Sequence, residues 1–298
     1  MGLKSRIRLL LGLTIGIWAT LLQGAVLTDS MGREVSIDGE PERIVTLAPS
    51  LTEIVYFLGL GDRVVGVTEF SSFPPDADRK PKVGSYVNLN AEKIISLAPD
   101  LVVGTADGNQ PRVVELLEKA GIPVFIVNPR DLRQVIETVV DIGRVCGVLD
   151  KAAALAGDLS ARVDRIVSRT ADQERPVVFL QVNPKPIMTV NGNTFSSDLI
   201  RLAGGLNMAR DEPITYPRIS LEAVIQRRPD VIIVSSMDRG GAFEQVKGQW
   251  LKLPIIPAAQ NGRVHLVDSD LIDRPSPRVV DGLEIVARLI HPDVVWDE

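Results

Sequence analysis

The stretch LDKAAALAGDLSARVDRIVSRTADQ, residues 149–173, has the residue spacing of one long helix. Apolar residues recur every three or four positions from Leu149 to Val167, and no proline interrupts them. At a rise of about 1.5 Å per residue, such a helix would extend for about 35 Å. Bending it would break backbone hydrogen bonds, so we expect residues 148–173 to join the two halves of the chain as a rigid connection.

The segments on both sides of this helix alternate between short apolar runs and helical patterns. The expected strands are 43–48, 63–68, 100–104 and 123–127 before the helix, and 176–182, 230–235 and 263–267 after it. Apolar strands that alternate with helices are typical of a parallel sheet covered on both faces. The sequence therefore predicts an α/β fold. Two similar three-layer lobes with parallel-rich sheets are expected, one at residues 25–147 and the other at 174–298.

Three of the expected helices have recognisable starts. Ser50 and Glu53 have the spacing of a capping box, in which each side chain bonds the backbone near the other. Asn90 and Ser220 each precede a short helical pattern and are expected to be N-cap residues.

The first 24 residues differ from the rest of the chain. Lys4, Arg6 and Arg8 precede an apolar run of about 14 residues, which has the length of a signal-peptide core and is short for a membrane span. Small residues follow at Gly24 and Ala25. We predict a cleaved signal peptide at residues 1–24, with an uncleaved anchor helix as the alternative.

The chain has one cysteine, Cys146, which lies far from the apolar run. A single cysteine cannot form an internal disulfide, and this one is not placed to carry a lipid anchor. Cys146 ends an amphipathic pattern and is expected to be a small core residue. These features predict a secreted protein, most simply a periplasmic one.

Composition and motifs exclude several classes of function. The formal net charge is −5 and no basic stripe is present, so nucleic acid is not an expected partner. The two histidines, His265 and His291, do not lie in expected cleft loops, so no metal site is predicted. No nucleophile motif, phosphate-binding loop or dinucleotide fingerprint occurs. We therefore expect neither an enzyme nor a resident cofactor.

Two stretches of the chain repeat each other at an offset of 130 residues: YVNLNAEKIISLAPDLVV at 86–103 and YPRISLEAVIQRRPDVIIV at 216–234. Tyr86 corresponds to Tyr216, and Glu92 corresponds to Glu222. Helix dipoles explain acids in first helical turns but not the paired tyrosines. Two facing lobes would present both tyrosines to one cleft, where aromatic rings suit a flat, largely apolar ligand. Two matched glutamates suit a partner that also comes in two copies.

The chain resembles the substrate-binding proteins of ABC importers that have a helical backbone (class III), which carry cobalamin, haem and siderophores. The resemblance covers nearly all of the chain after residue 24. Its markers are the two repeated stretches, the long helix, and the segments RIVTLAPSLTEIVYFLGLGDRVVGV and RPSPRVVDGLEIVARLIHP. The order and spacing of these segments are specific, whereas no single segment is.

Within this family the cobalamin carriers are the most similar, and the resemblance implies the following roles. The residues expected to contact a corrinoid ligand are Phe70, Tyr86, Tyr216, Asp270, Asp273 and Arg274, with Phe73, Asn88 and Asn183 as weaker candidates. Glu92 and Glu222 match the surface glutamates that engage arginines on the two membrane subunits of the importer. Thr105 stands where a further cleft tryptophan is expected. A monomeric carrier is implied.

Several alternatives remain open at this point. Haem could be the ligand, with Tyr86 as an axial ligand to iron, or a ferric siderophore could be. A secreted two-lobed enzyme that uses Asp270 and Asp273 belongs to a different class, but no base or nucleophile accompanies these acids. Phe70 and Phe73 could instead fill a loop against the core, and Arg274 could form a local ion pair within its turn.

Overall fold

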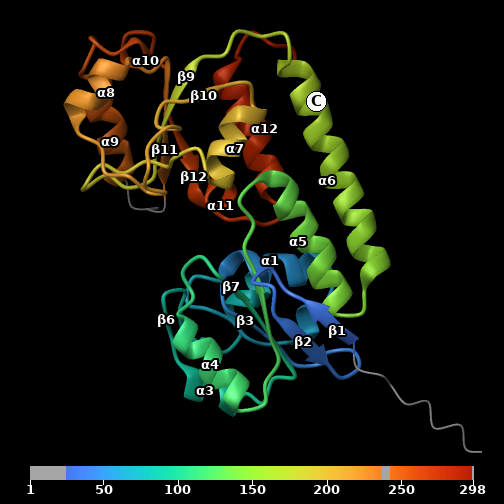
Figure 1. Ribbon diagram of the computed structural model, residues 1–298. Coiled ribbons are helices and arrows are strands. Elements are labelled where there is room, and N and C mark those ends of the chain that lie inside the picture. Colours follow the sequence, from blue (N-terminus) through green and yellow to red (C-terminus); the bar gives the residue numbers. More distant parts are fainter. Residues whose placement is uncertain (1–24, 237–241, 297–298) are drawn as a thin grey trace, which may run out of the picture.

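A computed structural model describes residues 25–236 and 242–296. The predicted signal peptide at 1–24 lies outside these residues. Two α/β lobes stand one above the other, and the long helix α6 (Leu149–Thr170) runs along one side of both (Figure 1). Among the described residues, no helix combines the length and the apolar character needed to cross a membrane.

The sheet of the N-terminal lobe has four parallel strands in the order β4-β3-β7-β8. Their bounds are Val64–Gly66, Ile44–Thr46, Leu101–Thr105 and Val124–Val127. Alternate side chains of these strands enter two different cores, as expected for a sheet buried on both faces. Helices α1 (Pro49–Phe57) and α5 (Leu132–Val145) cover one face, while α3 (Ala91–Ser96) and α4 (Pro111–Lys119) cover the other.

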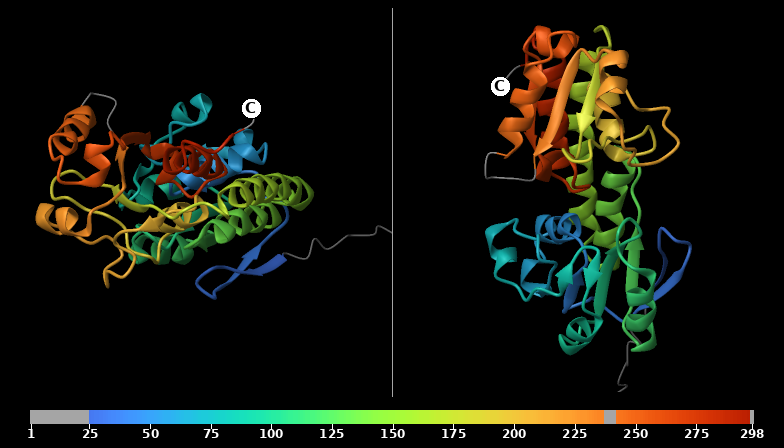
Figure 2. Two further views of the ribbon diagram at one scale, coloured as in Figure 1. Left: turned by 90° about the horizontal axis from the view of Figure 1, so that it is seen from above. Right: turned by 90° about the vertical axis from the view of Figure 1, so that its left-hand side faces the viewer.

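The C-terminal lobe repeats this plan with the parallel order β10-β9-β11-β12. The strands are Leu206–Asn207, Val177–Gln181, Val231–Ser236 and Val264–Asp268. Helices α7 (Phe195–Leu202) and α12 (Val279–Ile290) cover one face. The other face carries α8 (Leu221–Arg227), α9 (Ala242–Leu251) and α10 (Pro257–Gln260). The right-hand view of Figure 2 shows the two lobes from a second side, again one above the other.

Smaller elements complete the described chain. The hairpin β1 (Ala25–Thr28) and β2 (Glu34–Ile37) packs on the N-terminal lobe, and β5 (Gly84–Ser85) pairs with β6 (Asn88–Leu89). Short helical turns form η1 (Gly61–Arg63), α2 (Pro75–Asp78) and α11 (Ser269–Ile272). The predicted α/β fold with two similar parallel sheets is confirmed.

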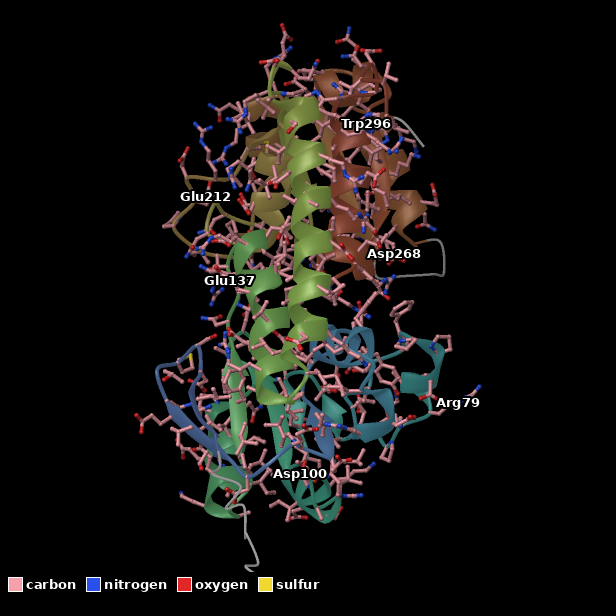
Figure 3. The ribbon with its side chains drawn as sticks, turned by 90° about the vertical axis from the view of Figure 1, so that its right-hand side faces the viewer. Arg79, Asp100, Glu137, Glu212, Asp268 and Trp296 are labelled. Carbon is pink, nitrogen blue, oxygen red and sulfur yellow. The ribbon has the colours of Figure 1, made fainter. Side chains whose placement is uncertain are left out.

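The predicted long helix is also present, and it packs against both lobes. Its buried face contributes Ala152, Leu159 and Ile166 to one core that runs from α1 and α5 through to α12. Gly143 of α5 allows α5 and α6 to approach each other closely, because a Cβ at this position would lie 2.2 Å from the Cβ of Ala152. Arg162 binds Asp281 of α12 at 2.7 Å. Figure 3 shows α6 face on, lying over both lobes.

The predicted helix starts have mixed outcomes. Asn90 and Ser220 are N-caps, since their side chains accept hydrogen bonds from the backbone N–H groups of Lys93 and Ala223. The capping box is wrong: α1 begins at Pro49 after Ala48, without a side-chain cap. Glu53 is instead fully buried in the helix, where it has a different set of partners, described below.

The repeat at an offset of 130 residues also has a structural role. Ala98 and Arg228 end equivalent helices with left-handed φ angles of 45° and 48°. Two residues later, Asp100 and Asp230 accept backbone N–H bonds at the start of the neighbouring strand, from Arg43 and Val177 respectively. The repeated Pro-Asp pair therefore fastens each short helix to the centre of its sheet.

Candidate ligand-binding cleft

A pocket lies between the two lobes, where strands of both sheets end. Loops that follow β3, β4, β7 and β8 meet the loop that follows β12, as expected because parallel strands share one carboxyl edge. The cavity measures about 460 Å³. Its lining comprises Ala48, Pro49, Ser50, Phe70, Tyr86, Thr105, Asp107, Asn128, Pro129, Phe195, Tyr216, Ser269, Asp270, Asp273, Arg274 and Pro275.

The two repeated tyrosines face this pocket from opposite lobes. The Oη of Tyr216 donates a hydrogen bond of 3.1 Å to the Asp107 carboxylate of the N-terminal lobe. Tyr86 packs against Gly108, whose φ is +105° and at which a Cβ would lie 2.1 Å from the tyrosine ring. Phe70 is 64% exposed and Tyr216 is 40% exposed, so both rings offer apolar surface to a ligand.

Burial and a nearby carboxylate raise the pKa of both phenols. Burial is the largest cause that raises the pKa of Tyr86, and the negative charge of Asp107 adds to it. The same two causes raise the pKa of Tyr216 to about 12. The Arg130 guanidinium, 3.9 Å from the Asp107 carboxylate, opposes the shift in both cases.

Three carboxyl groups belong to the polar part of the pocket lining. Asp107 comes from the N-terminal lobe, and Asp270 and Asp273 come from the C-terminal lobe. Asp273 accepts a hydrogen bond from Ser235 at the end of β11. Burial raises the pKa of Asp273 to about 6, and the nearby charge of Asp270 acts in the same direction.

The substitution Asp273→Asn is expected to stabilise the protein near neutral pH. The pKa of about 6 in the folded protein exceeds the ordinary 3.8, so the fold favours the protonated acid. The stability that Asp273 contributes is therefore highest below about pH 4 and is lost as the pH rises through about 6. Asparagine avoids this loss, so the free energy of unfolding at about pH 7 should rise by on the order of 1–3 kcal/mol. Urea unfolding between about pH 4 and pH 7 measures it; a gain that does not depend on pH would contradict the assignment.

Arg274 is the cation of the pocket lining, and two carboxyl groups hold it. Its Nη2 lies 2.7 Å from Oδ1 of Asp270, and its Nη1 donates to Oε1 of Glu53 at 3.1 Å. Its side chain is 16% exposed. The ion pair within its own turn is thus present, but Arg274 also reaches across to the opposite lobe.

The structure brings all six predicted ligand residues, and Thr105, around one pocket. Whether they bind a ligand stays a prediction.

The weaker candidates lie outside the lining. Phe73 stacks with Phe57 at 6.3 Å between ring centroids, and Asn183 donates to the Pro186 carbonyl. Asn88 stands in β6 and is also outside the lining.

Three further residues, Asp107, Asn128 and Phe195, line the pocket but were not predicted from the sequence. Asp107 follows a predicted strand at its carboxyl end, and this position could have indicated a pocket residue.

Glu92 and Glu222 lie in the first turns of α3 and α8 and are exposed. Both helices are on the side of the molecule away from α6 (Figure 1). Hydrogen bonds from its own backbone and from Ser220 lower the pKa of Glu222, so this carboxyl group is ionised at neutral pH. The two glutamates occupy equivalent exposed positions, one on each lobe.

Within residues 25–236 and 242–296, no group of three or more His, Cys, Asp or Glu side chains is arranged to hold a metal ion. His265 lies in β12, and His291 follows α12.

Comparison with known proteins identifies the family of this chain. The model of the periplasmic binding protein family matches residues 44–271, which contain both sheets and most of the pocket. The chain belongs to the periplasmic binding protein family. Its members are substrate-binding proteins of transport systems, not enzymes.

Two curated relatives cover most of this periplasmic binding protein. A vitamin B12-binding protein of Vibrio parahaemolyticus is 31% identical over 84% of this chain and 90% of its own length. An uncharacterised ABC transporter substrate-binding lipoprotein, YvrC of Bacillus subtilis, is 33% identical over 93% of this chain and 97% of its own length.

Solved structures of the helical-backbone class share its fold. The vitamin B12-binding protein BtuF of Vibrio cholerae is 30% identical, with a TM-score of 0.75 over 85% of this chain and 97% of that one. The heme-binding protein RhuT of Roseiflexus is 28% identical, with a TM-score of 0.76 over 85% and 99%. The fold and the family are therefore established, while the neighbours differ in ligand.

Proposed function

We propose that this protein captures a corrinoid of the cobalamin type in the cleft between its lobes and delivers it to an ABC importer. One observation carries the choice of ligand. Three carboxyl groups, those of Asp107, Asp270 and Asp273, line the same pocket as two tyrosine rings, and Arg274 is already held by Glu53 and Asp270. The pocket thus combines apolar ring faces with hydrogen-bond acceptors.

A corrinoid matches this combination chemically. Its macrocycle is flat and its edge carries carboxamide groups, which donate N–H bonds that carboxylates accept well. The exposed rings of Tyr216 and Phe70 and the half-buried ring of Tyr86 suit the flat macrocycle. The relatives from both Vibrio species, named as vitamin B12-binding proteins, support the same ligand class.

Haem is the second candidate, because the RhuT neighbour is named a heme-binding protein and Tyr86 lines the pocket. Two features of the cleft oppose it. Haem carries negative propionates, which the carboxylates of Asp107 and Asp270 would repel. Ligation of ferric iron by tyrosine requires the phenolate, and burial with Asp107 raises the pKa of Tyr86.

Delivery would use the two exposed glutamates. Glu92 and Glu222 occupy equivalent first turns on the two lobes, so one monomer can offer one carboxylate to each of two membrane subunits. Pairs between carboxylates and arginine are directional, which suits docking in a fixed orientation. We place the protein in the periplasm after cleavage of residues 1–24, in keeping with its family.

The proposal is tested by mixing the purified protein with cyanocobalamin or with haemin and separating free ligand by gel filtration. Both ligands absorb visible light, so the chromophore that elutes with the protein is read directly. We expect the corrinoid spectrum in the protein fraction at about one ligand per chain. Haemin in that fraction without cyanocobalamin would make haem the ligand.

A further inference from the structure

Glu53 is a fully buried acid of the N-terminal lobe whose side chain is bound by the C-terminal lobe. It stands on α1, and its relative exposure is 0%. Its Oε2 accepts a hydrogen bond of 2.6 Å from Ser276, and its Oε1 accepts bonds from Arg274 at 3.1 Å and from Arg278 at 3.3 Å. All three donors belong to the segment RPSPR at 274–278, more than 200 residues along the chain.

The same cluster reaches the loop of the N-terminal lobe that carries Phe70. Arg274 donates from Nη2 to the Phe70 carbonyl at 3.3 Å. The Arg278 guanidinium lies 4.1 Å from the ring centroid of Phe73, which in turn stacks with Phe57 of α1. The loop at 70–73 and the segment at 270–278 are thus bound to each other and to α1 around one carboxyl group.

Charge and burial make this arrangement sensitive to the loss of Glu53. The cluster contains two carboxyl groups, Glu53 and Asp270, and two guanidinium groups, Arg274 and Arg278. The side chains of Arg274 and Arg278 are only 16% and 15% exposed. Neutralising Glu53 would remove the carboxylate that both largely buried cations share, which favours their movement toward water.

Arg274 and Phe70 both line the pocket, whereas Glu53 does not. We propose that Glu53 is a positioning residue: it couples the two lobes beneath the pocket and holds Arg274 and the Phe70 loop in the geometry that receives the ligand. The coupling of the lobes follows from the contacts alone. The effect on ligand affinity rests, in addition, on the proposed function. On this proposal, the Glu53 cluster and α6 together limit the movement of one lobe relative to the other.

The coupling is tested without ligand, by hydrogen exchange of the full protein followed by mass spectrometry. Glu53→Gln keeps the size of the side chain and removes its charge. Amide exchange should accelerate by about tenfold or more in both segments, 70–73 and 270–278. Asp29→Asn is the matched control, since Asp29 is also buried, pairs with Arg33 and binds the Ile126 N–H. It should accelerate exchange only around β2 and β8. Unchanged exchange in either cleft segment of Glu53→Gln would overturn the coupling.

The positioning role is tested by a double-mutant cycle with cyanocobalamin as the probe. Glu53→Gln should weaken binding by about five- to fifty-fold, and it should have little further effect in an Arg274→Met background, because it acts through Arg274. Asp29→Asn should lower the melting temperature without changing affinity. Additive losses from Glu53→Gln and Arg274→Met would show that Glu53 does not act through Arg274. If the wild-type protein does not bind cyanocobalamin, the proposed function fails, while hydrogen exchange still decides the coupling.

Discussion

Reversing the charge of both Glu92 and Glu222 to arginine is expected to abolish cobalamin uptake while leaving ligand affinity within about threefold. Both carboxylates are exposed and neither lines the pocket, so the ligand would not sense the change. In the proposed docking, each new arginine would face the importer cation that is expected to pair with the glutamate, and like charges brought together cost binding energy. Uptake by cells that depend on this carrier, and affinity of the purified protein measured by calorimetry, give the two readings.

Asp150→Arg provides a matched control for this double variant. Asp150 is also an exposed acid in a first helical turn, but it belongs to α6, on the other side of the molecule from α3 and α8. Its reversal should leave uptake unchanged. Loss of ligand affinity in the double variant with docking intact would show that the repeated glutamates serve the cleft and not the importer.

Removing either tyrosine ring of the cleft should weaken cobalamin binding substantially. Tyr86→Ala and Tyr216→Ala each withdraw apolar area from the ligand, and the loss expected per ring is about 1–3 kcal/mol. That loss corresponds to about five- to 150-fold in the dissociation constant. Tyr216→Phe should lose less, because it keeps the ring and removes only the hydrogen bond to Asp107. Titration calorimetry on all three variants measures these differences.

Tyr56 supplies the control for the tyrosine variants. It lies on α1 and its Oη donates to Asp76 at 2.9 Å, outside the pocket lining. Tyr56→Phe should leave affinity unchanged. Unaltered affinity in both alanine variants of the cleft would mean that Tyr86 and Tyr216 only fill space between the lobes.

Much of the fold could be predicted from the sequence because its elements have strong local patterns. The apolar period of α6 and the absence of proline predicted one helix, and Asn90 and Ser220 predicted two helix starts. β10, at Leu206–Asn207, was not predicted because two residues cannot display a period. The capping box failed for a tertiary reason: Glu53 satisfies buried donors from another lobe, which no local pattern shows.

The candidate site could be predicted where its residues lie in the two repeated stretches or match positions in known carriers. Tyr86 and Tyr216 stand at equal places in the two repeated stretches, and both line the pocket. Asp107 lines the pocket and binds Tyr216, and Glu53 binds Arg274 beside the pocket. These contacts span 109 and more than 200 residues of chain, so only the folded structure reveals them. Phe73 was a weaker aromatic candidate, and its ring lies against Phe57 and Arg278 and not in the pocket.

The most direct test of the central claim is a calorimetric titration of the wild-type protein with cyanocobalamin and, separately, with haemin. A cleft lined by Asp107, Asp270 and Asp273 around Tyr86 and Tyr216 should bind one cyanocobalamin per chain and bind haemin more weakly. Tight binding of haemin with no heat from cyanocobalamin would contradict the assignment of a corrinoid ligand.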